Sequence, residues 1–540
     1  MSYKKWIMSS FMLILTLFML TACQTKNTEK TSNNENTNKP SNTGDPKEGG
    51  TLSFYDYDDP KTLDPHKTSA SATNSRIGLV YNKLVTFSTG PDKFSSGEVI
   101  PDLAKGWEIS EDGKTYTFHL RDDVKWQNIA PVNGRQFTSD DVIATMDRIK
   151  KLPGPQASSL VKVESIEAPD DYTVVFKLSE PFAPLLNHLA SYLMWILPRE
   201  ATDGKVDLDN AAIGTGPFIL ESWERGVSTV FKKNSDFFEK GKPYLDGVTI
   251  YPNGDAAKEI NAFRTGQTDV VYTDSKIDFE TLKKSASDTQ LQTEILTGTR
   301  LFINQTRKPL DNILVRKAMS MAIDREGAWE SIYGSGEYMG YLLPTLEEWA
   351  IPLEEREKYL VYDPEEAKEL LAEAGYPDGF EVSMIVTDGY GPQLVTVAEW
   401  VAEDLKAIGI KVNIEVLEYA TFFSERWPKK EYDIGMGLIT PVTDPSESLV
   451  PFFKSDGFRN WQGVSDPKLD EMLEQQNLIL DKNERIKYMN DIERYIFENV
   501  TNHVNLFAYH VHYFKQPYVR GFDPHSNYGN IHMKNVWLDK

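Results

Sequence analysis

Alternating apolar and polar positions predict a strand-rich region in the first half of the chain. Residues 107–120 alternate on both sides of Glu111-Asp112-Gly113, and residues 161–178 repeat the pattern around Pro169-Asp170-Asp171. Acidic and glycine residues between such runs are typical of tight turns. We therefore expect two antiparallel hairpins.

Helical and strand patterns alternate elsewhere. Residues 138–149 begin with a Thr and an Asp at the spacing of a capping pair, which predicts a short helix. A second helix is expected over 363–375, where Asp-Pro opens it and Gly ends it. A strand at 381–386, a helix at 394–408 and a strand at 412–416 then form a βαβ unit, which implies a parallel sheet.

The N-terminal segment has the layout of an export signal. A basic start at Lys4 and Lys5 precedes an apolar run that ends in Leu20-Thr21-Ala22-Cys23. We interpret residues 1–22 as a lipoprotein signal peptide and Cys23 as the site of lipidation, with acyl chains such as palmitate anchoring the protein to the cell membrane. An ordinary signal with a chance cysteine is the alternative. The polar, repetitive residues 23–48 are expected to be a disordered tether.

The composition and the absence of certain motifs argue against several classes of function. The net charge of −23 argues against a nucleic-acid partner, which requires basic patches. With a single cysteine, the chain can form no internal disulfide. There is no Walker A loop, no dinucleotide fingerprint, no Gly-x-Ser-x-Gly and no His-Glu-x-x-His, so no enzyme class is indicated.

A series of motifs, in order, resembles the bacterial extracellular solute-binding proteins of family 5, the receptors of peptide and nickel ABC importers. The resemblance covers residues 49–540, and its landmarks are Thr62-Leu63-Asp64-Pro65-His66, Trp107 to Arg121, Gly214-Thr215-Gly216-Pro217-Phe218, Gly241 to Asp246, Val315-Arg316-Lys317-Ala318, Ala322-Ile323-Asp324-Arg325, Tyr362-Asp363-Pro364 and Ala374-Gly375-Tyr376.

The resemblance implies an α/β, two-lobe, periplasmic-binding-protein-like fold, a Venus flytrap of type II from the large cluster with an extra strand-rich subdomain. Carried over to this chain, lobe I comprises 49–75, 213–300 and 509–540, the extra subdomain 76–212 and lobe II 301–508. The implied protein is a monomer that captures an oligopeptide between its lobes and delivers it to an ABC permease driven by a separate ATPase. It has no catalytic residues and needs no cofactor.

Two segments match the backbone edges that hold extended peptides in this family. The first contains Asp58 and Asp59, and the second contains Gly437 and Ile439. Glycine at 437 suits close approach of a ligand backbone, but an ordinary strand bend explains it equally well.

An acid is expected near the second segment to bind a peptide's ammonium group. Many peptide-binding relatives place an aspartate four residues before the proline that here is Pro445, and this position holds Pro441. Asp444 is the nearest acid and could accept the ammonium, although shaping the Asp-Pro turn is its simpler role.

Several other side chains are candidates for the ligand pocket. In a chain this rich in aromatic residues, a core position is the commoner explanation for each aromatic one, and the amide is expected to end a crossing strand. These residues are Tyr55, Tyr57, Trp195, Trp461 and Asn304.

His510 and His512 share one face of a predicted strand and could begin a nickel or zinc site. Two ligands are too few, so no metal site is assigned. A nickel chelate, a sugar conjugate or another small polar solute remains the alternative cargo of the same fold. A hydrolase acting on cell-wall peptide is the alternative of another class.

Overall fold

The computed structural model describes residues 44–56, 58–90, 98–152, 154–252, 255–439, 441–501, 503–525 and 529–540. The predicted signal peptide, the lipidation site Cys23, most of the tether and Tyr57 lie outside these residues. In the part that is described, every helix is too short or too polar to cross a bilayer.

The largest sheet has 11 strands and contains residues from both ends of the described chain. In spatial order its strands are β15 (Ile410–Leu417), β14 (Phe380–Thr387), β16 (Ile434–Ile439), β12 (Gln290–Ile303), β17 (His503–Lys515), β11 (Val270–Thr273), β1 (Thr51–Tyr55), β10 (Gly247–Tyr251), β9 (Ser228–Lys233) and β8 (Phe218–Glu224), while β13 (Gly336–Glu337) pairs with β17 off this path.

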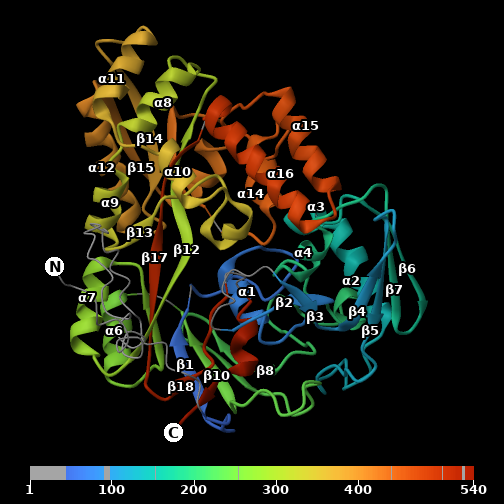
Figure 1. Cartoon of the computed structure of the whole chain (residues 1–540). Helices are drawn as coiled ribbons and strands as arrows, with labels where there is room; N and C mark the ends of the chain where they lie inside the picture. Colours follow the sequence, from blue (N-terminus) through green and yellow to red (C-terminus); the bar gives the residue numbers. More distant parts are fainter. Residues whose placement is uncertain are drawn as a thin grey trace, which may run out of the picture. The chain divides into compact units, whose positions relative to one another are not determined.

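The long antiparallel strands β12 and β17 join the two halves of this sheet. At one end β12 pairs with β16, and at the other end β17 pairs with β11. Figure 1 shows the pair running from the part that holds β14 and β15 to the part that holds β1 and β10. Any ligand-driven movement of one half against the other must therefore bend or twist these two strands.

The predicted βαβ unit is confirmed. β14 and β15 pair in parallel from Phe380↔Ile410 to Thr387↔Leu417, and α12 (Pro392–Ala407) connects them. The preceding helix α11 (Pro364–Glu373) begins at the predicted cap, because the Asp363 side chain accepts hydrogen bonds from the backbone N–H groups of Glu365 and Glu366.

The two predicted hairpins form one antiparallel sheet in the order β4 (Ala104–Ile109), β5 (Thr115–Leu120), β7 (Thr173–Leu178) and β6 (Val163–Asp170). The second turn lies at 171–172, later than predicted. A register shift between Glu167 and Asp170 lets β6 continue through Pro169, which an edge strand tolerates.

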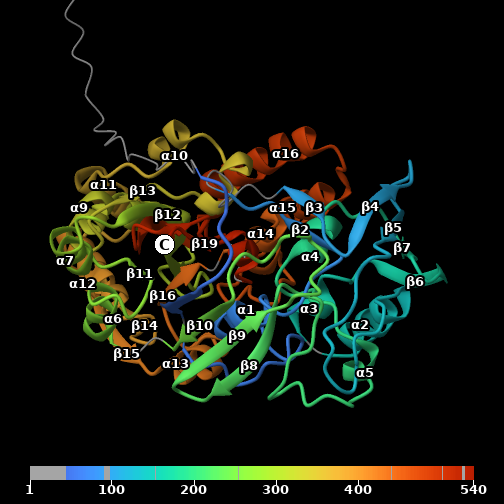
Figure 2. The ribbon, with the colours of Figure 1, turned by 90° about the horizontal axis from the view of Figure 1, so that it is seen from below.

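Helix α2 (Ser139–Lys151) packs beside this sheet and begins with the predicted capping box of Thr138 and Asp141. Figure 2 shows β4–β7 with α2 at one side of the molecule and β14, β15 and α12 at the other.

The remaining elements surround these sheets. Two short sheets pair β2 (Val85–Phe87) with β3 (Val99–Pro101) and β18 (Val519–Arg520) with β19 (Trp537–Leu538). The other α-helices are α1 (Ser71–Ile77), α3 (Pro155–Ser158), α4 (Leu185–Ala190), α5 (Arg199–Thr202), α6 (Ala256–Arg264), α7 (Lys276–Ser285), α8 (Ile313–Met321), α9 (Arg325–Ile332), α10 (Leu353–Tyr359), α13 (Tyr419–Thr421), α14 (Pro445–Phe453), α15 (Pro467–Gln475) and α16 (Lys482–Tyr495). Short 3-10 and π turns are η1 (Pro344–Trp349), η2 (Phe422–Arg426), η3 (Gln476–Leu478), η4 (Ile496–Val500) and η5 (Ile531–Asn535).

Buried apolar side chains gather in separate clusters rather than in one core. One packs α8, α9, α11 and α12 against β14–β16, another fills the four-stranded sheet and α2, and a third lies around β1 and β10. A fourth lies among η1, α14, α15 and α16. The domain boundaries given above stay a prediction.

Candidate functional site

A cavity of about 810 Å³ lies between two segments that are distant in the sequence. One wall comes from residues 158–193, and the other from residues 441–478, with Ser69 at the edge. We call it the large cavity. Its size is that of pockets that enclose small organic ligands.

The start of α14 shapes the second wall. Asp444 is its N-cap, Pro445 follows at the first helical position, and the Glu447 carboxylate accepts a hydrogen bond from the Asp444 backbone N–H at 3.2 Å. This capping box turns the chain sharply after Thr443, so that residues 441–443 face the cavity.

A fully buried ion pair supports this turn. The two guanidinium NH2 groups of Arg485, on α16, donate to the Asp444 carboxylate at 2.6 and 2.8 Å. Burial alone would raise the pKa of Asp444, but the Arg485 guanidinium outweighs burial and holds the pKa at about 2. Asp444 is therefore ionised and already paired, and it does not appear among the residues that line the large cavity.

Direct contacts hold the two walls together. The Asn187 amide of α4 donates to the Thr443 carbonyl and to the Asp444 carboxylate, both at 3.1 Å. The Ala183 backbone N–H donates to the Asn477 carbonyl at 2.8 Å, and His188 Nε2 lies 3.6 Å from Glu447 Oε1. Figure 1 shows α4 and α14 adjacent, in agreement with these contacts. These contacts join the two walls of the large cavity.

Among the described residues that line this cavity, Arg459 is a cation without an ion-pair partner. Its side chain is exposed to solvent, and partial desolvation by the neighbouring protein lowers its pKa, with Tyr192 and Tyr390 acting in the opposite direction. The guanidinium carbon lies 5.6 Å from the Phe452 ring centroid and 5.4 Å from that of Phe458. Within the described ranges, no carboxylate forms an ion pair with Arg459, so it can accept one from a ligand.

Tyr192 lies within electrostatic range of both signs of charge. Burial raises its pKa to about 12, the Glu447 carboxylate adds to the rise, and the Arg459 guanidinium opposes it. Apolar surface completes the walls, including the 64% exposed Phe458. The cavity therefore combines a cation, an anion and aromatic surface, which suits a ligand that carries both charges and an apolar side chain.

Trp195, one of the predicted site residues, is almost fully buried. Its Nε1 donates to Asn74 Oδ1 at 3.0 Å, and its carbonyl contacts His66 Nε2 at 2.9 Å. It lines a different, smaller cavity.

Gly437 and Ile439 lie on β16, and Asn304 directly follows β12. Asn304 is fully buried, and its side chain bonds to the carbonyls of Lys430 and Tyr432. Gly437 faces a ring, since an added Cβ would lie 3.2 Å from Trp427. The Ile439 carbonyl accepts a hydrogen bond from Thr297 Oγ1 at 2.6 Å.

The first segment lies at the end of β1. The Tyr55 ring packs on Tyr251 at 5.3 Å, Asp58 is exposed, and Asp59 Oδ1 accepts from Trp223 Nε1 at 2.8 Å. None of them borders the large cavity, and their contact with ligand stays a prediction.

Trp461 is partly buried against Trp427, with ring centroids 5.8 Å apart. Arg459, two residues before it, is the residue of this segment that reaches the large cavity. The sequence suggested Trp461 as the candidate of the Arg459-Asn460-Trp461 run and did not distinguish Arg459 from an ordinary surface arginine. No local pattern could have done so, because the missing ion-pair partner of an arginine can lie anywhere in the fold.

His510 and His512 each bond to a hydroxyl. His510 Nδ1 lies 2.8 Å from Ser335 Oγ, and His512 Nδ1 lies 2.9 Å from Thr293 Oγ1. Burial lowers the pKa of His512 to about 4. The described chain contains no cluster of three or more His, Cys, Asp or Glu side chains with metal-binding geometry.

Comparison with known families identifies the family of this chain. Residues 98–460 match the model of the bacterial extracellular solute-binding proteins, family 5 Middle. The chain belongs to this family. It is a solute-binding protein with a periplasmic-binding-protein fold, as the motifs predicted, and the members of the family are substrate-binding proteins of transport systems that act outside the cytoplasm.

Relatives differ in the solute that their names give. The chain is 29% identical to the dipeptide-binding protein of Escherichia coli (81% of this chain, 85% of the relative) and 30% identical to heme-binding protein A of Haemophilus influenzae (77% and 79%). A solved structure of an ABC transporter-associated periplasmic binding protein from Helicobacter pylori, in complex with the peptide STSA, matches with a TM-score of 0.76 at 27% identity, covering 92% of this chain and 99% of that one.

Proposed function

We propose that this solute-binding protein is a lipid-anchored receptor of an ABC importer, that it captures oligopeptides in the large cavity, and that it delivers them unchanged to a membrane permease. The observation that carries the proposal is Arg459, a cavity cation with no ion pair among the described residues, which suits a ligand with a carboxylate such as a peptide's C-terminus. The peptide-binding relatives support the same choice.

A peptide suits the charges and surface of this cavity. Its terminal carboxylate would pair with the Arg459 guanidinium, a charge-assisted hydrogen bond of the stronger kind. Its ammonium group would lie toward Glu447, and its side chains would contact the aromatic walls. Backbone and terminal groups are common to all peptides, so such a site binds many sequences.

Closure would couple binding to delivery. A ligand that contacts residues 158–193 and residues 441–478 together stabilises the closed arrangement in proportion to its extra contacts there. In this proposal the two lobes have the boundaries predicted from the sequence, and the chain acts as a monomer without catalysis.

The anchor is proposed from the sequence alone. Leu20-Thr21-Ala22-Cys23 places a thiol where diacylglycerol would be attached, outside the cytoplasmic membrane. Replacing Cys23 with alanine should release the protein from the membrane fraction of its host into the soluble fraction, and unchanged membrane retention would rule the anchor out.

Native mass spectrometry of the gently purified receptor tests the cargo. We expect mass adducts whose released components fragment as intact peptides of mixed sequence. Adducts that fragment as a porphyrin, a metal chelate or a sugar conjugate would instead establish the alternative cargo, which Pro441 at the usual acidic position and the heme-binding relative favour. Peptides recovered in cleaved form would indicate a hydrolase.

A further inference from the structure

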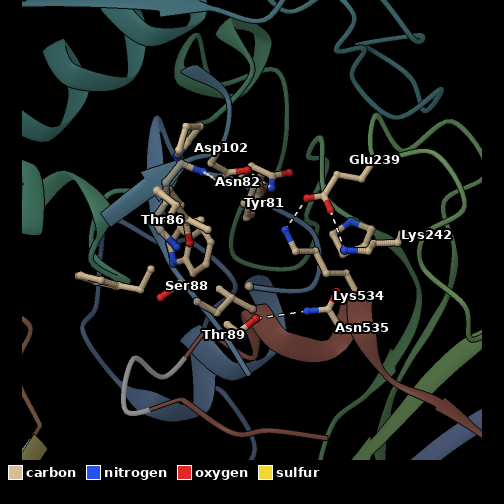
Figure 3. Close-up of a pocket in the computed structure, with 18 residues that line it drawn as sticks. Tyr81, Asn82, Thr86, Ser88, Thr89, Asp102, Glu239, Lys242, Lys534 and Asn535 are labelled. Atoms are coloured by element: carbon tan, nitrogen blue, oxygen red, sulfur yellow. Dashed lines mark hydrogen bonds and ion pairs between the residues drawn. The ribbon is translucent and has the colours of Figure 1, made fainter. Parts of the chain in front are cut away.

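A second cavity, of about 310 Å³, lies away from the large one and shares no lining residue with it. Its walls come from residues 78–89, residues 100–102 at the end of β3, Trp195, Pro217, residues 239–242 and η5. Figure 3 shows Asp102 and Asn82 on one side of this cavity and Glu239, Lys242 and Lys534 on another. We call it the lysine cavity.

Most of its charged groups already have partners. Glu239 pairs with Lys534 and, at 3.1 Å, with Lys242, as the dashed lines in Figure 3 show. The Asp102 carboxylate accepts hydrogen bonds from Asn82 Nδ2 at 2.8 Å and from the Lys83 backbone N–H at 2.9 Å. These contacts leave the side chain of Lys83 as the remaining charge.

Lys83 lines the cavity with its side chain fully buried. Its Nζ lies 4.0 Å from the centroid of the Trp195 ring, and no hydrogen-bond acceptor of the described residues is within reach. A cation–π contact replaces only part of the hydration that an ammonium loses on burial. Accordingly, burial lowers the pKa of Lys83 to about 8, although the Asp102 carboxylate acts against the decrease.

We propose that the lysine cavity is a second binding site, for a small monocarboxylate with an apolar body, and that the carboxylate of this ligand accepts hydrogen bonds from Lys83 Nζ. The lining contains Lys83, Lys242 and Lys534 against Asp102 and Glu239, an excess of one positive charge that one carboxylate neutralises. The remaining walls include Tyr81, Phe87, Ile100 and Ile531, which suit a short apolar body rather than a polyanion such as phosphate.

This site is independent of the cargo proposed above, because none of its residues takes part in the large cavity. A ligand here would contact the β2–β3 sheet and the turn that follows α1, and it would connect both to η5 near the C-terminus. It would therefore join parts of the chain that are distant in sequence.

Benzoate and benzamide provide a matched pair of probes, since they share shape and differ in charge. Titration of the whole protein by calorimetry should show saturable binding of benzoate, with benzamide at least about tenfold weaker. Lys83→Met keeps the apolar stem and removes the ammonium. It should weaken the binding of benzoate by about tenfold or more, to the affinity of benzamide. Lys105→Met, at an exposed position of β4, should leave both affinities unchanged.

Absence of benzoate binding at millimolar concentration, or equal binding by wild type and Lys83→Met, would overturn the proposal and leave Lys83 as a structural partner of Trp195.

Discussion

The ion pair between Asp444 and Arg485 makes one carboxylate important for the whole second wall of the large cavity. Asp444→Asn would leave the buried Arg485 guanidinium without its counter-ion. Breaking such a pair from one side destabilises a protein by about 3–5 kcal/mol. We expect this loss in the free energy of unfolding at pH 7, measured by urea denaturation.

Asp481→Asn is the control for this change, because Asp481 caps α16 at an exposed position and asparagine caps equally well. The urea midpoint of Asp481→Asn should stay within experimental error of the wild-type midpoint. A similar small effect for both variants would show that Asp444 is not paired in solution.

The same carboxylate predicts a pH dependence. The folded-state pKa of Asp444 is about 2, below the value of about 3.9 in an unfolded chain. Its contribution to stability is therefore complete above about pH 4 and is lost as the pH falls toward about 2. The difference in urea midpoint between wild type and Asp444→Asn should shrink over this range, whereas a constant difference would contradict the assigned pKa.

At the residue scale, local roles were readable from the sequence and distant partners were not. The Asp-Pro pair at 444–445 indicated a turn and became an N-cap. Its partner Arg485 is 41 residues away, and no local pattern links the two. Trp195 was selected as a pocket residue and does line a cavity, but a second one whose other walls come from residues 78–102 and 531–535.

At the scale of elements, a substitution at Gly437 on β16 distinguishes the two roles that the sequence left open for this glycine, close approach of a ligand backbone and an ordinary strand bend. Gly437→Ala would place a Cβ 3.2 Å from Trp427 and 3.4 Å from Phe302. Overpacking of this kind destabilises by about 1–3 kcal/mol, so we expect a lower melting temperature and unchanged peptide affinity.

Gly106→Ala on β4 is its control, since nothing lies within 4 Å of the added Cβ. Calorimetric titration with peptide and thermal unfolding together decide the question. Weaker peptide binding by Gly437→Ala without loss of stability would favour close approach of a ligand backbone.

Helices and strands with one buried face could be predicted from the spacing of their apolar residues. α12 and the strands beside it were predicted because Val397, Val401 and Leu405 keep helical spacing against the sheet. The turn after β6 was misplaced because a bulge adds residues without changing composition. The pairing of β12 with β17 joins residues about 200 positions apart, and no local pattern in the sequence predicts it.

At the scale of the whole molecule, the Asn187 amide is a test of closure. It lies on α4 and donates to both the Thr443 carbonyl and the Asp444 carboxylate, which joins the two walls of the large cavity. Asn187→Ala removes a hydrogen bond to a charged group, worth about 1.5–3 kcal/mol, only when the walls are together. We therefore expect about tenfold weaker peptide binding and a larger radius of gyration without ligand by X-ray scattering.

Asn499→Ala removes an exposed amide whose hydrogen bond stays within one turn, and it should change neither quantity. Equal scattering profiles and equal affinities for the two variants would show that the contact between the walls does not contribute to closure.

The central claim is that Arg459 in the large cavity binds the carboxylate of a peptide. The direct measurement is calorimetric titration of wild type and Arg459→Met with L-alanyl-L-leucine and with its C-terminal amide, with Arg199→Met, at an exposed ion pair, as the control. The account predicts that the wild type and the control prefer the free acid by about tenfold or more, while Arg459→Met binds both peptides equally weakly. Retention of the full preference for the acid in Arg459→Met would contradict it.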